Sequence, residues 1–151
     1  MKIDLHMAST TLFMFSPFSL MKSAIIIDDS LPIGLLANTA ACIATGLFHH
    51  QPEAYGPEIH GSDHTFIPIT KIPILILKKG KRDFEEILRR IQSTDLRHMI
   101  FTKEAQSTAD YNEYVKRTEG KSLSALHIIG IGIIGDDTQV TKVAGDMPLL
   151  R

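Results

Sequence analysis

The sequence predicts an α/β protein in which a sheet of four strands, mostly parallel, is sandwiched between helices. Two observations lead to this class. Four short apolar runs, rich in β-branched residues, are spaced along the chain, and segments with helical periodicity lie between them. Strands that alternate with helices favour such a layered arrangement. The chain has 151 residues, 44% of them hydrophobic, which is enough for one domain with its own core.

The four predicted strands are continuous apolar runs, which suit strands covered on both faces. They span residues 23–27, 71–78, 96–101 and 124–135. The last run contains the glycines of the segment GIGIIG, which permit another backbone to approach closely. No helix pattern follows these glycines directly, so a phosphate-binding loop is not predicted there.

Three helices are predicted between the strands, over residues 32–47, 80–93 and 107–120. The first has Ser30 as a candidate cap and Pro32 in its first turn. The second is amphipathic, with apolar residues at i, i+3, i+4 and i+7, namely Phe84, Ile87, Leu88 and Ile91. Residues 49–70 are rich in histidine, proline and glycine and are predicted to form a loop, and residues 136–151 close the chain.

The helix over residues 32–47 carries an unexpected amide. Its apolar residues cover most of its circumference, so we expect burial nearly all round. Asn38, Cys42 and Thr45 form one narrow polar stripe at i, i+4 and i+7. A buried amide without a partner costs a few kcal/mol, so Asn38 must be engaged. Two alternatives follow: Asn38 bonds the backbone of the loop over residues 49–70, or it faces a pocket and contacts a ligand.

Acidic residues follow the first predicted strand. In open α/β sheets, ligands bind beyond the carboxyl ends of the strands, and Asp28 and Asp29 lie there. The nearby helix N-terminus would favour an anion, but these carboxylates would repel one, which favours a capping role. The candidate ligand-binding residues are therefore Asn38, Asp28, Asp29 and Thr39. We expect their pocket to lie between Asp28–Asp29, Asn38 and the loop that carries Asp63 and His64.

The histidine-rich loop supplies a candidate catalytic pair. His64 follows Asp63, and a carboxylate can fix the tautomer of an imidazole that acts as a general base. The four loop histidines form no regular metal-binding motif, so neither a metal nor another cofactor is predicted.

The tail of the chain resembles that of type II peptidyl-tRNA hydrolases. Gly130-Ile131-Gly132 and Val143-Ala144-Gly145, with Leu149, fill the places of the closing motifs of those enzymes. A closer resemblance covers the segments KSAIIIDDSLPIGLLANTAACIATGL, TADYNEY and MPLLR. These look like an uncharacterised bacterial family, catalogued as a domain of unknown function, number two-thousand, and assigned the same fold. The resemblance implies a three-layer α/β/α sandwich with a four-stranded mixed sheet, and it implies no activity.

The hydrolase reaction does not follow from this resemblance. Those enzymes carry a lysine, a glutamine and a histidine in the first helix and an aspartate after the third strand. The corresponding positions here are Leu35, Thr39, Cys42 and Thr102. A leucine cannot replace a lysine that grips phosphate.

The composition of the chain limits the classes of binding partner and the cellular compartment that can be expected. The formal net charge is −1, which does not indicate a nucleic-acid or membrane-surface protein. The basic run Lys78–Arg82, with Arg89 and Arg90, is predicted to be a solvated helix face. Cys42 is the single cysteine, so no internal disulfide forms, and a cytoplasmic location is expected.

The function predicted first is therefore a small-ligand binding or regulatory domain. The alternative is a hydrolase-type enzyme of unknown substrate that uses His64, Asp63 and Asn38, with peptidyl-tRNA hydrolysis favoured less.

Residues 1–21 are predicted to be an extension or arm outside a single domain over residues 22–151, and this extension is too short to span a membrane. If ordered, this extension must bury its apolar side chains, which favours a homodimer.

Overall fold

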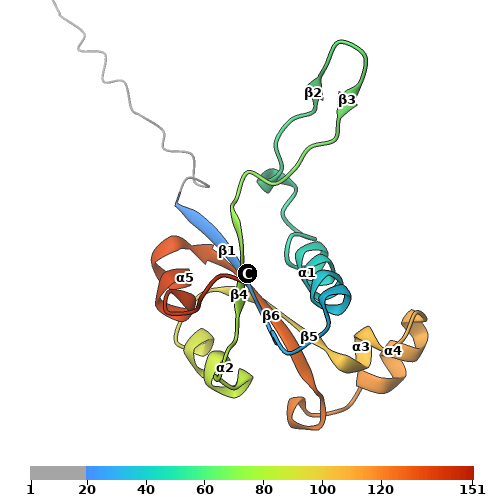
Figure 1. Cartoon of the computed structure of the whole chain (residues 1–151), viewed down its shortest axis with the longest axis vertical. Helices are drawn as coiled ribbons and strands as arrows, with labels where there is room; N and C mark the ends of the chain where they lie inside the picture. Colours follow the sequence, from blue (N-terminus) through green and yellow to red (C-terminus); the bar gives the residue numbers. More distant parts are fainter. Residues whose placement is uncertain (1–19) are drawn as a thin grey trace, which may run out of the picture.

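The computed structural model describes residues 20–151 and contains a four-stranded mixed sheet (Figure 1). Almost all of the predicted extension over residues 1–21 lies outside the described residues. The strand order is β4-β1-β6-β5. The bounds are β1 Met21–Ile27, β4 Ile74–Lys78, β5 Arg97–Thr102 and β6 Ile128–Asp136.

The prediction of a mostly parallel sheet is wrong, because β6 is antiparallel to both of its neighbours. Among the strands of residues 20–151, only β1 and β4 pair in parallel. The reason lies in the connection that follows β5. Helices α3 (Lys103–Gln106) and α4 (Tyr111–Thr118) and the 3-10 turn η2 (Leu123–Ala125) stay at the end of the sheet where β5 finishes. The chain therefore enters β6 from that end, and β6 runs back along β5.

Helices cover both faces of the sheet. Helix α1 (Ile33–Leu47) packs on one face, and α2 (Phe84–Gln92) and α5 (Asp137–Ala144) pack on the other (Figure 1). Side chains of β1 alternate between the two cores: Ile25 and Ile27 contribute to the α1 side, whereas Ala24 and Ile26 contribute to the α2–α5 side. All four are fully buried, as predicted for a strand covered on both faces.

Two glycines of β6 let α1 approach the sheet closely. A Cβ atom added at Gly130 would lie 2.7 Å from Cδ1 of Ile43 and 2.8 Å from Cγ2 of Thr39. A Cβ atom at Gly132 would overlap Cγ2 of Ile43 more severely. Close backbone approach, predicted from the GIG pattern, is confirmed.

Helix α1 is not buried all round, contrary to the prediction. Its buried positions, Thr39, Ile43 and Leu47, form one stripe that faces the sheet. On the outside, Ile33 is 86% exposed, and Asn38 is exposed as well. The many alanines of α1 make it apolar on every side, but within residues 20–151 no second layer covers its outer face.

The helices after β5 differ from the prediction in their boundaries. The helix expected over residues 107–120 begins at Tyr111, where the Asp110 carboxylate accepts a hydrogen bond from Asn112 N. The shorter α3 precedes it, capped by Thr102. The sequence prediction did not include α5, whose N-terminal amides donate to the Asp136 carboxylate.

The segment predicted as a loop contains a projecting hairpin, here called the arm (residues 55–70). It follows the 3-10 turn η1 (Pro52–Ala54), and its two short strands, β2 (Ile59–His60) and β3 (Thr65–Phe66), pair in antiparallel fashion. Figure 1 shows the arm extending away from the sheet, beyond the C-terminal end of α1.

Part of the predicted basic cluster is neutralised by ion pairs between α2 and the C-terminal segment. Arg90 donates to Asp146 at 2.9 Å and to Glu86 at 2.6 Å, and Arg82 donates to Asp146 at 2.7 Å. The hydrogen bond to Asp146, followed by that to Glu86, raises the pKa of the Arg90 guanidinium above its usual value. These pairs fasten α2 to the chain end beside α5.

Candidate ligand-binding site

A cavity of about 460 Å³ lies between α1 and the segment that runs from β5 to α4. This volume falls within the range usual for small-molecule sites. The residues around it come from α1, β5, α3, the connection to α4, and α4 itself. They are Asn38, Cys42, Thr45, Gly46, Met99, Phe101, Ala105, Gln106, Thr108, Ala109, Asp110, Tyr111 and Tyr114.

The polar stripe of α1 faces this cavity. Asn38, Cys42 and Thr45, which the sequence placed on one side of the helix, all line it. One alternative was that Asn38 bonds the backbone of residues 49–70, and the structure shows no such hydrogen bond within residues 20–151. Its Oδ1 accepts a hydrogen bond from Gln106 Nε2 at 3.3 Å, and its side chain reaches the cavity rather than the core.

Gln106 organises the polar side of the cavity, and the sequence prediction did not identify it. Its Nε2 lies within hydrogen-bond distance of Leu35 O at 3.2 Å, Thr39 Oγ1 at 2.9 Å and Asn38 Oδ1 at 3.3 Å, so its two protons are shared among three acceptors. Thr39 is fully buried, and its hydroxyl donates to Leu35 O at 2.8 Å. Leu35 O can only accept, and the Thr39 proton is already engaged. The nitrogen of Gln106 must therefore point toward α1.

This orientation leaves one hydrogen-bond donor and one hydrogen-bond acceptor available at the cavity. Within residues 20–151, neither Asn38 Nδ2 nor Gln106 Oε1 makes a hydrogen bond. The first is a donor and the second is an acceptor. The two carboxamides are joined by their own hydrogen bond, so the free donor and acceptor belong to one connected pair at the cavity.

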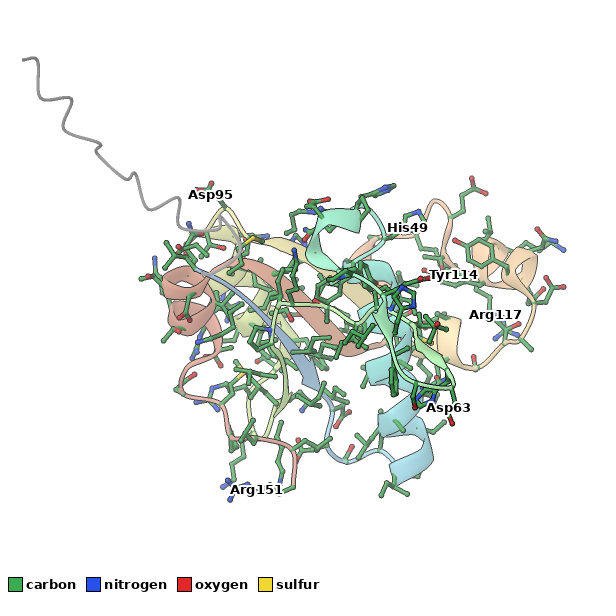
Figure 2. The ribbon with its side chains drawn as sticks, turned by 90° about the horizontal axis from the view of Figure 1, so that it is seen from above. His49, Asp63, Asp95, Tyr114, Arg117 and Arg151 are labelled. Carbon is green, nitrogen blue, oxygen red and sulfur yellow. The ribbon has the colours of Figure 1, made fainter. Side chains whose placement is uncertain are left out.

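The rest of the cavity is apolar and aromatic. Met99 and Phe101 of β5 and Ala105 of α3 line it, and Tyr111 and Tyr114 line it from α4. The two tyrosine rings stand edge to face, with centroids 5.5 Å apart and an interplanar angle of 82°. Figure 2 shows Tyr114 between α1 and the helix that carries it. A planar ligand can pack against such rings.

The charge at the cavity is acidic. Asp110 is the one lining residue with a formal charge, and none of the lining residues is a lysine, arginine or histidine. Its carboxylate caps α4 by accepting from Asn112 N at 2.8 Å. An anion would therefore meet a carboxylate without a compensating cation, whereas a neutral or cationic ligand would not.

A carboxylate outside the cavity holds α3 in place. Glu104 accepts from His127 Nδ1 at 2.8 Å and from the His127 backbone N at 3.1 Å, which ties α3 to the residue before β6. Burial alone would raise the pKa of Glu104, but the hydrogen bonds from the His127 side chain and from backbone amides lower it to about 2. An ionised Glu104 therefore fixes the helix that presents Gln106.

The predicted residues Asp28 and Asp29 have local structural contacts. Asp28 accepts from the backbone N and the hydroxyl of Ser30, at 3.1 and 2.7 Å. Asp29 accepts from Gly80 N at 3.0 Å, which links the end of β1 to the turn after β4. Ser30 does not cap α1, because Pro32 occupies the N-cap position and no side chain bonds the first turn.

Asp63 and His64 lie at the tip of the arm. They contact each other and are both exposed. Figure 1 shows the arm at the end of the molecule opposite to the carboxyl end of β1. The sequence interpretation placed Asp28–Asp29, Asn38 and Asp63–His64 around one pocket. This is wrong, because the structure does not bring the three groups together.

Two broader properties of residues 20–151 bear on the class of site. No group of three or more histidine, cysteine, aspartate or glutamate side chains in this region is placed to hold a metal ion. No helix in the same region has the length and apolar character needed to cross a membrane.

The fold and the cavity together define a single α/β domain with a mixed sheet and a candidate small-molecule site. The chain belongs to the family described as "Protein of unknown function (DUF2000)", whose model matches residues 21–151. Among solved structures, it is similar to a protein of unknown function from Agrobacterium tumefaciens strain C58. The identity is 18%, the TM-score is 0.78, and the match covers 87% of this chain and 98% of the other. None of the curated proteins matches the chain.

Proposed function

We propose that this domain binds a small organic molecule in the cavity between α1 and α4. The observation that carries the proposal is the carboxamide pair of Asn38 and Gln106 at the cavity, with a donor and an acceptor left free. Ligand sites combine an apolar lining with a few convergent polar groups, and Met99, Phe101 and Tyr114 supply the apolar part.

The ligand class that fits best is neutral or cationic and planar, with adjacent hydrogen-bond donor and acceptor groups. An amide, a lactam or a heterocycle with such an edge would accept from Asn38 Nδ2 and donate to Gln106 Oε1. Its ring would pack against Tyr111 or Tyr114. The Asp110 carboxylate disfavours anions, and this separates the proposal from a phosphate or carboxylate site.

Binding without catalysis accounts for the lining better than a hydrolase does. A nucleophile needs a neighbouring base, and no histidine lines the cavity beside Cys42. The pair Asp63–His64 lies on the arm. We therefore favour a ligand-binding or regulatory role over an enzyme that uses His64.

Two further parts of the proposal concern fold type and compartment. The glycine-rich β6 and the closing segment support a fold of the type II peptidyl-tRNA hydrolase kind, without the hydrolase reaction. The unpaired, half-buried Cys42 supports a cytoplasmic location.

A matched set of fragments tests the ligand class by thermal shift. Benzamide, benzamidine and benzoate share one ring and are respectively neutral, cationic and anionic at pH 7, and nicotinamide and nicotinate form a second pair. We expect the amides to raise the Tm most, because they can accept from Asn38 Nδ2 and donate to Gln106 Oε1. The amidinium can only donate and should raise the Tm less, and the carboxylates should not raise it. A ligand at about ten times its Kd stabilises by about 1.4 kcal/mol, which is a shift of several degrees.

The Asn38→Ala variant assigns any response to the cavity. Loss of one neutral hydrogen bond should weaken binding about 3- to 10-fold. A preference for the carboxylates, or an unchanged response in Asn38→Ala, would contradict the proposal.

A further inference from the structure

The arm exposes several large apolar side chains to solvent. Ile67 is 86% exposed and Ile69 is 80% exposed, and Ile59 and Phe66 are exposed over more than half of their surface. Isolated exposed hydrophobic residues are common on soluble proteins, but contiguous apolar patches mark interaction surfaces. Ile59 and Phe66 are cross-strand partners and share one face of the hairpin, and Ile67 and Ile69 follow Phe66 directly along the chain. The four exposed residues are therefore concentrated on one projecting element.

Backbone hydrogen bonds hold the arm together from base to tip. Tyr55 and Thr70 form an antiparallel bridge at the base, where Gly56 N also donates to Ile69 O at 2.9 Å. The strands β2 and β3 pair in the middle, and Gly61 N donates to His64 O at 2.8 Å at the tip. A two-stranded ribbon alone is at best marginally stable in water, so cover from another surface would stabilise this one.

The arm is suited to meet a copy of itself. It forms a sheet of only two strands, so within residues 20–151 both outer edges remain without a strand partner. A two-fold axis brings the same surface of two subunits together. One arm would thus supply the edge and the apolar side chains that the other arm needs, and no second type of surface is required.

The exposed area also matches what a dimer needs. Ile59, Phe66, Ile67 and Ile69, together with the part-exposed Tyr55, offer roughly 600–700 Å², taking about 200 Å² for each large side chain and its exposed fraction. A standard interface buries about 800 Å² on each partner. Adjacent backbone and polar side chains of the arm can supply the remainder.

We propose that the arm, through Ile59, Phe66, Ile67 and Ile69, is the surface by which two copies of this chain associate. This inference is independent of the ligand proposal, because none of these residues lines the cavity.

Sedimentation equilibrium of the full chain tests the proposal. The wild type should be a dimer at micromolar concentration. The double variant Ile67→Ser/Ile69→Ser removes two exposed side chains from each subunit, and we expect the dimer Kd to rise at least about 100-fold. The matched control is Ile33→Ser, which removes a side chain of equal exposure from the outside of α1, and it should remain a dimer.

Each other result contradicts the inference. A monomeric wild type at 100 µM would show that the arm is covered by another segment of the same chain or by a different partner. A double variant that remains a dimer would place the interface elsewhere. Both variants should keep the circular dichroism spectrum of the wild type, because the substituted side chains are exposed.

Discussion

The contact between α1 and β6 can be tested by one added methyl group. Gly132→Ala places a Cβ atom against Cγ2 of Ile43, with Leu47 Cδ2 at 3.3 Å on the other side. Ile43 is fully buried and Leu47 nearly so, and neither can move away without displacing α1. Overpacking of this kind costs about 1–3 kcal/mol.

A gain in backbone propensity opposes this cost. Alanine is favoured over glycine within a strand by about 0.5–1 kcal/mol, so overpacking should win and leave a net loss of about 1–2 kcal/mol. For a domain of this size the Tm should fall by about 3–10 °C. Urea unfolding followed by circular dichroism measures the free energy of unfolding, and an unchanged m-value would confirm that the folded state stays compact.

The control is Gly34→Ala in the first turn of α1. A Cβ atom there meets no atom within 4 Å, so this variant should be as stable as the wild type or up to about 1 kcal/mol more stable. If Gly132→Ala were equally harmless, α1 would not lie as close to β6 as described, and the position of Asn38 at the cavity would lose its support.

Three further predictions concern the residues around the cavity. Asn38→Ala should change the Tm by less than about 2 °C, because the amide is exposed; a loss of 2 kcal/mol or more would show that it is structural. Thr39→Val removes a fully buried hydroxyl that both donates and accepts, and it should cost about 1–3 kcal/mol by urea unfolding; an unchanged stability would refute the described network. For Glu104 the pKa is lowered in the folded state, so its contribution is present above the unfolded pKa of 4.5 and is lost as the pH falls toward 2. Glu104→Gln should therefore be less stable than the wild type by about 1–3 kcal/mol at pH 6, and the difference should shrink to less than about 1 kcal/mol at pH 2.5. Glu113→Gln, which breaks an exposed pair, should cost less than about 1 kcal/mol. A difference for Glu104→Gln that does not depend on pH would contradict the assignment.

Much of the sheet could be predicted because the local hydrophobic pattern of its residues indicates how they are buried. The run from Ser23 to Ile27 is apolar at nearly every position, which suits only a strand covered on both faces, and it is fully buried. Gly130 and Gly132 predicted a close approach of another element to the strand, because glycine weakens a strand unless such an approach requires it. The periodicity of α1 likewise placed Asn38, Cys42 and Thr45 on one side, and that side lines the cavity.

The errors arise where the outcome depends on distant parts of the chain. Alanine is compatible with burial and with exposure, so the apolar outline of α1 could not show that its outer face is open. Gln106 lies 67 residues from Thr39 in the sequence, and no local pattern marks a glutamine that will contact three residues of another helix. The composition of residues 49–70 indicated an irregular segment but could not show that it projects as a hairpin.

The most direct test of the ligand proposal is a ¹⁵N–¹H correlation spectrum recorded during titration with the amide fragment that gives the largest thermal shift. We expect the side-chain NH₂ signals of Asn38 and Gln106 to move, together with backbone signals of Ala105 and Tyr114. Perturbations confined to the arm or to the α2–α5 face, with the two carboxamide signals unchanged, would contradict it.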